Sequence, residues 1–346
     1  MGGWMSPESD TAVRPRLSGF RATGLIVALL VLAALCVASL AVGARHIDLD
    51  TLWRVVWVDD GSEEAYIVRD LRFPRTVVGL IVGLALGLAG ALMQSLTRNP
   101  LADPGLLGIE IGASTAVVVA ISILGITAPA GYIWFALLGA AVTAVVVYLL
   151  GASGRQATPD RMVLAGAAIT AALTAVVGII LLLDAQTFDR YRYWVIGSLS
   201  GRGMDVFFQV GPFIATGAVL ALLLGRSLNA LALGEETGRA VGARLGQTRV
   251  LGAIAVTLLC GAATAAAGPI AFVGLTIPHI ARAITGPDHR WLLPYSAVLA
   301  PILVLAADVV GRVVGSPGEL QAGIVMAFIG APVFIALARR RRIGQL

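Results

Sequence analysis

The chain has 346 residues, of which 58% are hydrophobic and only 13% are charged, whereas soluble proteins carry about 25% charged residues. This composition excludes a water-soluble enzyme and a disordered chain. All 25 basic residues are Arg, against 20 acidic residues, which gives a net charge of +5. Without Lys, the chain lacks a Walker A phosphate loop and a Schiff-base lysine. Two dispersed Cys and three scattered His give no zinc spacing, so we expect no metal site.

Ten segments are candidates for membrane-spanning helices, which need about 20 mostly apolar residues. The first has a longer apolar run than a signal peptide, so we expect a retained helix. One segment, 270–285, is shorter and is interrupted by Gly274 and Pro278. We therefore predict one transmembrane domain over 23–338, an N-terminal tail over 1–22 and a basic tail over 339–346. The predicted spans are 23–44, 76–97, 106–126, 131–151, 162–183, 206–225, 249–268, 270–285, 292–314 and 318–338.

The charges predict an orientation for these spans. With the N-terminus inside, 16 Arg and 7 acidic residues lie on the inner side, against 9 Arg and 11 acidic residues outside. Cytoplasmic loops carry the excess of positive charge, so we expect both termini in the cytoplasm. The use of Arg without Lys suggests a GC-rich bacterial genome, so we expect the chain in a bacterial plasma (inner) membrane. The cluster Arg340 to Arg342 favours contact with anionic membrane lipid over nucleic acid.

Two blocks of four spans, 76–183 and 249–338, each open with an Arg followed by a helix punctuated by Gly. One span and a polar inner segment lie between the blocks, so they enter the membrane from opposite sides, as inverted repeats of transporters do. The polar segment 228–247 predicts two short helices hinged near Gly234 and Gly242. A partner-docking element and a simple amphipathic loop are both open for this segment.

Several motifs in the same order resemble those of the FecCD-type permeases, which are the membrane subunits of ABC importers for iron–siderophore chelates, haem and vitamin B12. The resemblance covers about residues 70–340. The motifs are LRFPR at 71–75, ALMQ at 91–94, RNPLADPGLLG at 98–108, LALGE at 231–235, GPIAFVGLTIPH at 268–279, DHRWLLP at 288–294, AD at 307–308, GELQAG at 318–323 and GAPVF at 330–334.

The resemblance implies an all-α polytopic membrane protein with about ten transmembrane helices, the type II ABC importer permease fold with inverted four-helix repeats. It implies a dimer with a second permease subunit, which is either the same chain or a homologue. Two cytoplasmic ATPase subunits would hold the ATP and Mg, so this chain would be non-catalytic and carry no cofactor. An external substrate-binding protein, either periplasmic or a lipoprotein, would dock from outside.

The resemblance also assigns residues to the two docking faces. Arg72, Arg75 and Arg312 match positions that meet acidic residues of the binding protein, and guanidinium groups suit this because they pair with carboxylates. The alternative is that Arg72 and Arg75 only anchor a helix end at the interface. The positions that match the ATPase-coupling segment are centred on Gly234, Glu235, Arg239 and Gly242.

The translocation pathway would be lined by the fifth, eighth and tenth spans. Thr170 and Thr174 share one helix face and are gate candidates together with Gln94, although a Thr can instead bond to its own helix. Asp308 lies inside a span and needs a partner; we interpret it as structural, with Arg312 one turn away. Glu110 departs from the family pattern, and pathway lining and pairing across helices are both open for it.

An iron–siderophore chelate is the first choice of substrate, since most members of the family carry such chelates, with haem and cobalamin next. A different class remains open: a secondary transporter driven by an ion gradient, with Glu110 and Asp308 as proton carriers. A membrane receptor or scaffold without transport is a third hypothesis.

Overall fold

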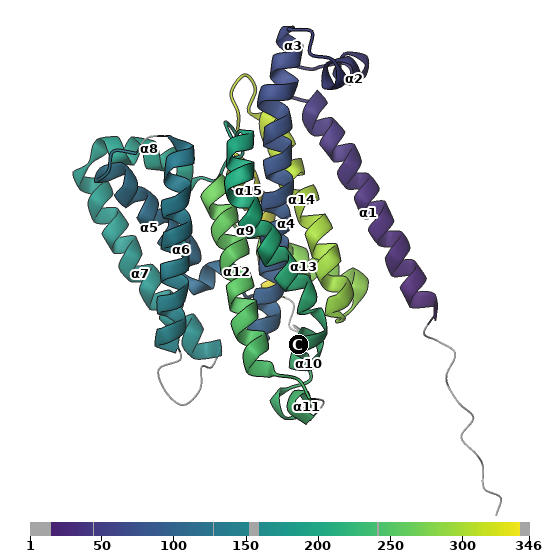
Figure 1. Ribbon diagram of the computed structural model, residues 1–346, viewed down its shortest axis with the longest axis vertical. Helices are drawn as coiled ribbons and strands as arrows, with labels where there is room; N and C mark the ends of the chain where they lie inside the picture. The colour runs from purple at the N-terminus through teal and green to yellow at the C-terminus, as the bar shows by residue number, and fades with distance from the viewer. Residues whose placement is uncertain (1–14, 44, 127, 152–158, 241, 340–346) are drawn as a thin grey trace, which may run out of the picture.

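The computed structural model describes residues 15–43, 45–126, 128–151, 159–240 and 242–339, and these residues form helices and no strand. Seven helices in this part of the chain are long and apolar enough to cross a membrane, and shorter apolar helices accompany them (Figure 1). Each predicted span coincides with one helix. The ten helices are α1 (Pro15–Ala41), α4 (Phe73–Thr97), α5 (Ile109–Ser122), α6 (Pro129–Gly151), α7 (Pro159–Leu183), α9 (Met204–Leu223), α12 (Leu245–Ala267), α13 (Val273–Thr285), α14 (His289–Val314) and α15 (Ala322–Arg339).

Several helices differ in their bounds from the predicted spans. Helix α5 is much shorter than the predicted 106–126, because Pro104–Leu107 forms a separate 3-10 turn, η2, and Gly108 follows with a left-handed φ of 69°. Helix α1 begins eight residues before 23, a polar extension that hydropathy does not detect, and α15 begins four residues after 318. Residues 1–14 and 340–346, which include the predicted lipid-binding Arg cluster, lie outside the described residues.

Short helices cap both ends of the bundle (Figure 1). One end, the α2 end, carries α2 (Leu49–Trp57), α3 (Glu63–Tyr66), the π-helical segment η1 (Ile67–Arg72) and α8 (Ala185–Val195). The opposite end, the α10 end, carries α10 (Gly225–Ala232) and α11 (Glu235–Ala240), and it is also where α1 begins. These are the two short helices expected over 228–247, and Gly234 separates them with a φ of 103°.

The backbone breaks in the same way in both four-helix blocks. The first helix of each block, α4 or α12, ends at a residue with positive φ, Arg98 (51°) or Gly268 (75°). The second helices, α5 and α13, are short, with 14 and 13 residues, and each follows a left-handed residue, Gly108 or Phe272, both with φ of 69°. A bulky residue such as Phe272 rarely has a left-handed backbone. The occurrence of this conformation at the same place in both blocks therefore supports the repeat.

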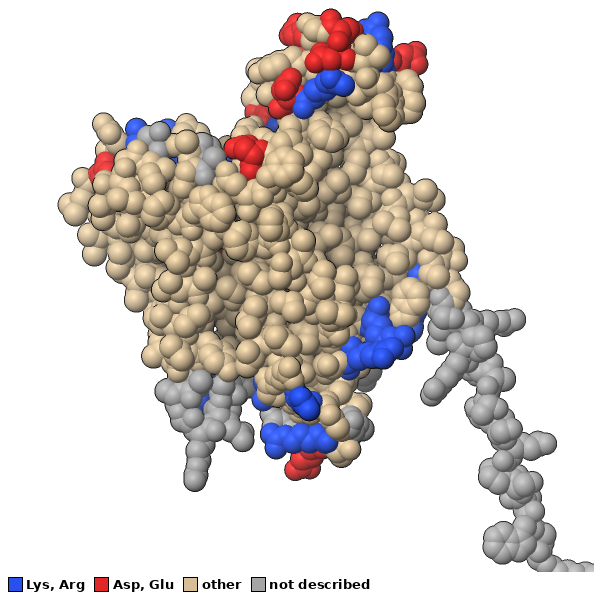
Figure 2. All heavy atoms as spheres, in the orientation of Figure 1, with Lys and Arg blue, Asp and Glu red and all other residues tan. Residues whose placement is uncertain are grey.

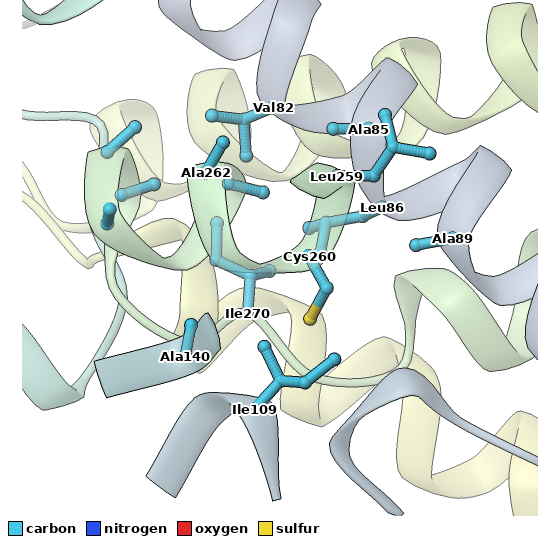
Figure 3. Packing of buried hydrophobic residues seen from close by; sticks show 14 of the residues in the cluster. Val82, Ala85, Leu86, Ala89, Ile109, Ala140, Leu259, Cys260, Ala262 and Ile270 are labelled. Atoms are coloured by element: carbon cyan, nitrogen blue, oxygen red, sulfur yellow. The ribbon is translucent and has the colours of Figure 1, made fainter. Parts of the chain in front are cut away.

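Helix α4 is the centre of the core, and it packs on α12, α13 and α14. Figure 3 shows Val82, Leu86 and Ala89 of α4 facing the α12 residues around Cys260. In lipid no hydrophobic effect drives helices together, so their association depends on close packing. Glycine lets the helix backbones approach closely. At Gly83 of α4, an added methyl group would lie 2.5 Å from Cα of Pro301 in α14, so no larger residue fits there.

Candidate functional site

Charged side chains gather at the two ends of the bundle, with a wide band of uncharged surface between them (Figure 2). Acidic and basic groups mix at the α2 end, where α2, α3 and η1 lie. The band between the ends is what a bilayer requires, and the two charged ends are the surfaces that water-soluble partners can reach.

The α2 end contains a buried ion-pair cluster. Asp308 of α14 is completely buried, and it accepts hydrogen bonds from Nε and Nη2 of Arg75 at 3.0 and 2.8 Å. Arg75 Nη1 donates to Glu319 Oε2 at 2.8 Å. Arg312 Nη2 also lies 3.1 Å from Asp308 Oδ2, which is the partner expected from the one-turn spacing. Burying Asp308 is tolerated because two guanidinium groups neutralise and hydrogen-bond it.

Helix α1 is fastened to this cluster by arginine side chains. Arg312 Nη1 donates to the carbonyl oxygens of Ser39 and Val42 at 2.9 and 3.1 Å. Arg72 Nη1 donates to the carbonyl oxygens of Leu40 and Ala41 at 2.7 and 2.8 Å. These carbonyls belong to the last turn of α1 and the residue after it, where backbone acceptors have no helical partner. The arginines therefore cap α1 and join it to α4 and α14.

This arrangement changes the interpretation of the predicted docking residues. Arg72, Arg75 and Arg312 are only 7%, 7% and 2% exposed, so they are not freely exposed contacts, and the anchoring role that was the alternative is present in the structure. They nevertheless line one cavity of about 380 Å³ at the α2 end. The charged residues lining this cavity are Arg45, Asp70, Arg72, Arg75, Arg202, Arg312 and Glu319.

The cavity therefore carries more positive than negative charge. Glu319 is its half-buried carboxylate. Burial raises the pKa of Glu319, but the charge and hydrogen bond of Arg75, together with a hydrogen bond from Ser200, outweigh burial and hold the pKa below its ordinary value. Arg45 is paired with Glu63 and Glu64, and Arg75 and Arg312 are paired with Asp308. Among the described residues no carboxylate lies within ion-pair distance of Arg72, so the cavity is suited to receive a further carboxylate there.

The α10 end is joined differently, through a hydrogen-bond network centred on Asn229 of α10, in which Asp288 is the charged partner. Asn229 Nδ2 donates to Asp288 Oδ1 at 2.7 Å, and this bond turns the other end of the amide, Oδ1 of Asn229, toward His289. That oxygen accepts from the backbone N–H of His289 at 2.9 Å and lies 2.8 Å from Nδ1 of its ring. The other ring nitrogen lies 2.7 Å from Ser95 Oγ of α4. One side chain of α10 thus contacts the start of α14 and, through His289, the end of α4.

Asp288 caps the N-terminus of α14, and its carboxylate accepts from the backbone N–H of Arg290. Burial raises the pKa of Asp288, but the hydrogen bonds from Asn229 and Arg290 outweigh burial and lower the pKa. A second link comes from Arg98, whose Nη2 donates to the carbonyl oxygen of Leu231 in α10 at 2.7 Å. Helix α10 is therefore held by both α4 and α14.

Gln94 does not lie where a gate residue was expected. It is fully buried in α4, and its Nε2 donates to the carbonyl oxygen of Leu275 in α13 at 3.1 Å. Its Oε1 accepts from Arg282 Nη1 at 3.2 Å. Both ends of the amide are thus used in joining α4 to α13 beside Pro278, where the proline removes a backbone donor. These bonds give Gln94 a structural role, and its assignment as a gate residue stays a prediction.

The remaining predicted residues lie apart from these networks. Thr170 is half-buried and Thr174 is exposed on α7, so a pathway role for this face stays a prediction. Glu110 lies in the first turn of α5, where the helix dipole favours a carboxylate. It points toward the turn at Gly105, as does Asp103; its role stays open.

In the predicted coupling segment, Arg239 is exposed on α11 and lines a cavity at the α10 end. Gly242, with a φ of 81°, follows α11. The side chain of Glu235 lies outside the described residues. Elsewhere, the part of the chain that the structure describes contains no group of three or more His, Cys, Asp or Glu residues that could hold a metal ion.

Sequence reasoning missed Asn229, Ser95 and Arg98, and it treated His289 as an ordinary packed residue. One signal was available, since the DHR motif at 288–290 places an Asp directly before a helix, which is an N-cap pattern. No sequence signal pairs Asn229 with a residue 60 positions away.

A polytopic helical bundle with two charged ends and two repeated four-helix blocks has the design of a transporter permease. The FecCD transport family model matches residues 29–340, and the chain belongs to this family of ABC importer permeases.

Similar proteins include the ferric enterobactin transport system permease protein FepD of Escherichia coli (strain K12), 45% identical over 93% of this chain and 95% of that protein. The hemin transport system permease protein HmuU of Yersinia pestis is 35% identical over 95% and 97%. A solved structure of an ABC transporter assigned to the metal-chelate type, in an inward-facing conformation, superposes with a TM-score of 0.82 at 25% identity, covering 92% of this chain and 99% of that one.

Proposed function

We propose that this chain is the membrane-spanning permease subunit of an ABC importer that moves an iron–siderophore chelate inward. The observation that carries the proposal is the 45% identity to a ferric enterobactin permease over almost the whole of both chains. A relative that carries hemin, at 35% identity, makes haem the second candidate. ATP hydrolysis would take place on separate ATPase subunits, and this chain would be non-catalytic.

The α2 end is the docking face for an external binding protein in this proposal. Its cavity is lined by five arginines, of which Arg72 is bonded to backbone carbonyls with no carboxylate within ion-pair distance among the described residues. An acidic side chain of a binding protein that enters the cavity would supply the missing negative charge and be steered by the field of the arginines.

The α10 end is the ATPase face. Helices α10 and α11 project beyond the bundle (Figure 1), and Gly234 between them provides a hinge. A displacement of α10 by an ATPase would act on α14 through Asn229 and on α4 through Arg98. Both are long helices that reach the α2 end, so movement at one face is transmitted to the other without a titrating group.

The excess of Arg on the α10 side supports an orientation with this end in the cytoplasm of a bacterial inner membrane. A second permease subunit is expected because one side of the bundle is thinly covered: only 11% of the most apolar stretch of α7 is buried. Whether that subunit is another copy or a homologue does not alter the proposed role of this chain.

Reconstitution in liposomes with the ATPase subunits and the binding protein tests the proposal. We expect uptake of the ferric chelate that requires both ATP and the loaded binding protein. Uptake that persists without ATP and stops with an uncoupler would replace the proposal with a gradient-driven transporter. A complex that binds partners but moves no chelate, haem or cobalamin would instead indicate a receptor.

A further inference from the structure

Arg202 is a buried charged residue that no part of the proposed transport cycle uses. It lies in the loop between α8 and α9, and only 7% of it is exposed. It is one of the residues that line the cavity of about 380 Å³ at the α2 end. The other four arginines of this cavity pair with carboxylates or donate to backbone carbonyls.

The side chain of Arg202 has no such partner. In the part of the chain that the structure describes, none of its nitrogens forms a hydrogen bond or an ion pair, and its Nε is buried without an acceptor. Asp205 comes close to Gly203 but forms no ion pair with Arg202, and Glu319 is bound by Arg75. A guanidinium that is removed from water without a carboxylate is costly, so an anion that binds Arg202 offsets this cost.

The loop that carries Arg202 is held in a fixed shape. Leu199 is completely buried, and its carbonyl oxygen accepts from the backbone N–H of Arg202 at 3.4 Å, which closes a turn. Gly201 is the third residue of this turn and has the positive φ, 69°, that a type II turn requires there. The backbone N–H of Ser198 donates to the carbonyl oxygen of Ala267 in α12 at 2.7 Å. A loop that is already ordered loses little entropy when a ligand binds.

The size and chemistry of the cavity indicate a small oxyanion. A volume of about 380 Å³ lies at the lower end of the range for small-molecule sites, about 300–1,000 Å³. Arg72 lines the same cavity, but both of its terminal nitrogens donate to backbone carbonyls, so it adds positive charge and Arg202 supplies the donors. The N–H groups of a guanidinium match two oxygens of a carboxylate or a phosphate, and chloride has no such pair.

We propose that the cavity at the α2 end binds one small oxyanion, a phosphate or a carboxylate, through Arg202. In the proposed importer this anion would occupy the cavity that an acidic side chain of the binding protein enters, so it would compete with docking. Only that consequence rests on the proposed function. The site itself belongs to this chain alone, and its test needs neither a binding protein nor transport.

Equilibrium dialysis of the purified full-length protein in detergent tests the site, with radiolabelled inorganic phosphate and radiolabelled acetate as separate probes. Sodium chloride keeps the ionic strength constant. We expect saturable binding of one oxyanion per chain, and the probe that binds more tightly identifies the preferred class. Arg202→Gln should weaken this binding about ten-fold, as expected for the loss of a charged hydrogen-bond donor. Arg202→Lys, which keeps the charge but not the paired N–H groups, should weaken it less.

The matched control is Arg190→Gln, which removes the same charge from an exposed position on α8, outside the cavity lining. It should bind the oxyanion as the unaltered protein does. In chloride alone, Arg202→Gln should unfold at no lower temperature than the unaltered protein, because it loses no bond, and this readout separates a ligand site from a structural role. Non-saturable binding, unchanged binding in Arg202→Gln, an equal loss in Arg190→Gln, or a lower unfolding temperature of Arg202→Gln would each overturn the proposal.

Discussion

The two ends of the bundle hold their helices with different chemistry. At the α2 end, Arg75 and Arg312 surround the buried Asp308, and charged hydrogen bonds lock α1, α4 and α14 together. At the α10 end, Asn229 and His289 join α10 to α14 through bonds of which most are neutral. Breaking a buried ion pair is much more expensive than shifting a neutral hydrogen bond that water can replace. The difference indicates a rigid α2 end and an α10 end that can move.

The largest effect should come from breaking the rigid end. Asp308→Asn leaves the buried guanidinium groups of Arg75 and Arg312 without their carboxylate, so we expect a loss of about 3–5 kcal/mol in the free energy of unfolding. Denaturant unfolding of the purified protein in detergent measures it. The control is Glu63→Gln, which breaks an exposed pair with Arg45 and should change stability by at most about 1 kcal/mol. Equal losses in the two variants would contradict a charge-locked end.

The next largest effect concerns the cavity at the same end. Arg72→Gln removes a guanidinium that has no carboxylate within ion-pair distance in the described part of the chain, and we expect the affinity for the external binding protein to fall by about 2 kcal/mol, or about 30-fold. Titration of the binding protein onto the reconstituted transporter measures this at low and high salt. Arg54→Gln, at an exposed position on α2, should leave the affinity nearly unchanged. If both variants bind equally well, docking does not use the cavity.

Hydropathy and spacing predicted the elements of both ends but not how they are joined. Each span follows from about 20 local residues, and the pairing of Asp308 with Arg312 follows from one helical turn. The contact between Asp308 and Arg75 crosses 233 positions, and a single sequence contains no information on such pairs. For this reason the sequence did not reveal that Arg72, Arg75 and Arg312, which were predicted to meet a binding protein, are buried and join helices; their docking role stays a prediction.

The same limit applies to the partners of Gln94 and to the start of α5. A polar residue in an apolar helix suggests a pathway. The partners of the Gln94 amide belong to α13, a segment distant in the sequence, where Pro278 leaves the carbonyl of Gly274 without its helical donor and Gln94 Nε2 lies 3.4 Å from that oxygen. Helix α5 begins only after Gly108 because the backbone of Gly108 is left-handed, and hydropathy does not report φ. In contrast, the hinge at Gly234 was predictable, because a Gly between two short polar helices has a local cause.

A smaller effect should follow from loosening the α10 end. Asn229→Ala removes the contacts from α10 to Asp288 and His289, and we expect a loss of about 1 kcal/mol in stability. The coupling between ATP hydrolysis and transport should change more than the stability. We expect uptake per ATP hydrolysed to fall about five-fold while the ATPase stays bound. Uptake and hydrolysis measured together in the same liposomes provide this ratio. Arg226→Ala, exposed on the same helix, should leave it unchanged, and an unchanged ratio in Asn229→Ala would remove Asn229 from the coupling path.

The smallest expected effect concerns Glu319. This residue lies at the partly exposed rim of the charged cluster, whereas Asp308 at its centre is fully buried. The pKa of Glu319 is lower in the folded protein than its ordinary value, because Arg75 outweighs burial. Its stabilising contribution is therefore complete above the unfolded value of about 4.3 and is lost as the pH falls through the lower folded pKa. Glu319→Gln should be less stable than the unaltered protein at pH 6, and the difference should shrink below about pH 4. Thermal unfolding of both proteins in detergent from pH 6 to pH 3 measures the difference. A gap that stays constant over this range would show that the carboxylate contributes through shape and not through its charge, and the cluster would then be confined to Arg75, Asp308 and Arg312.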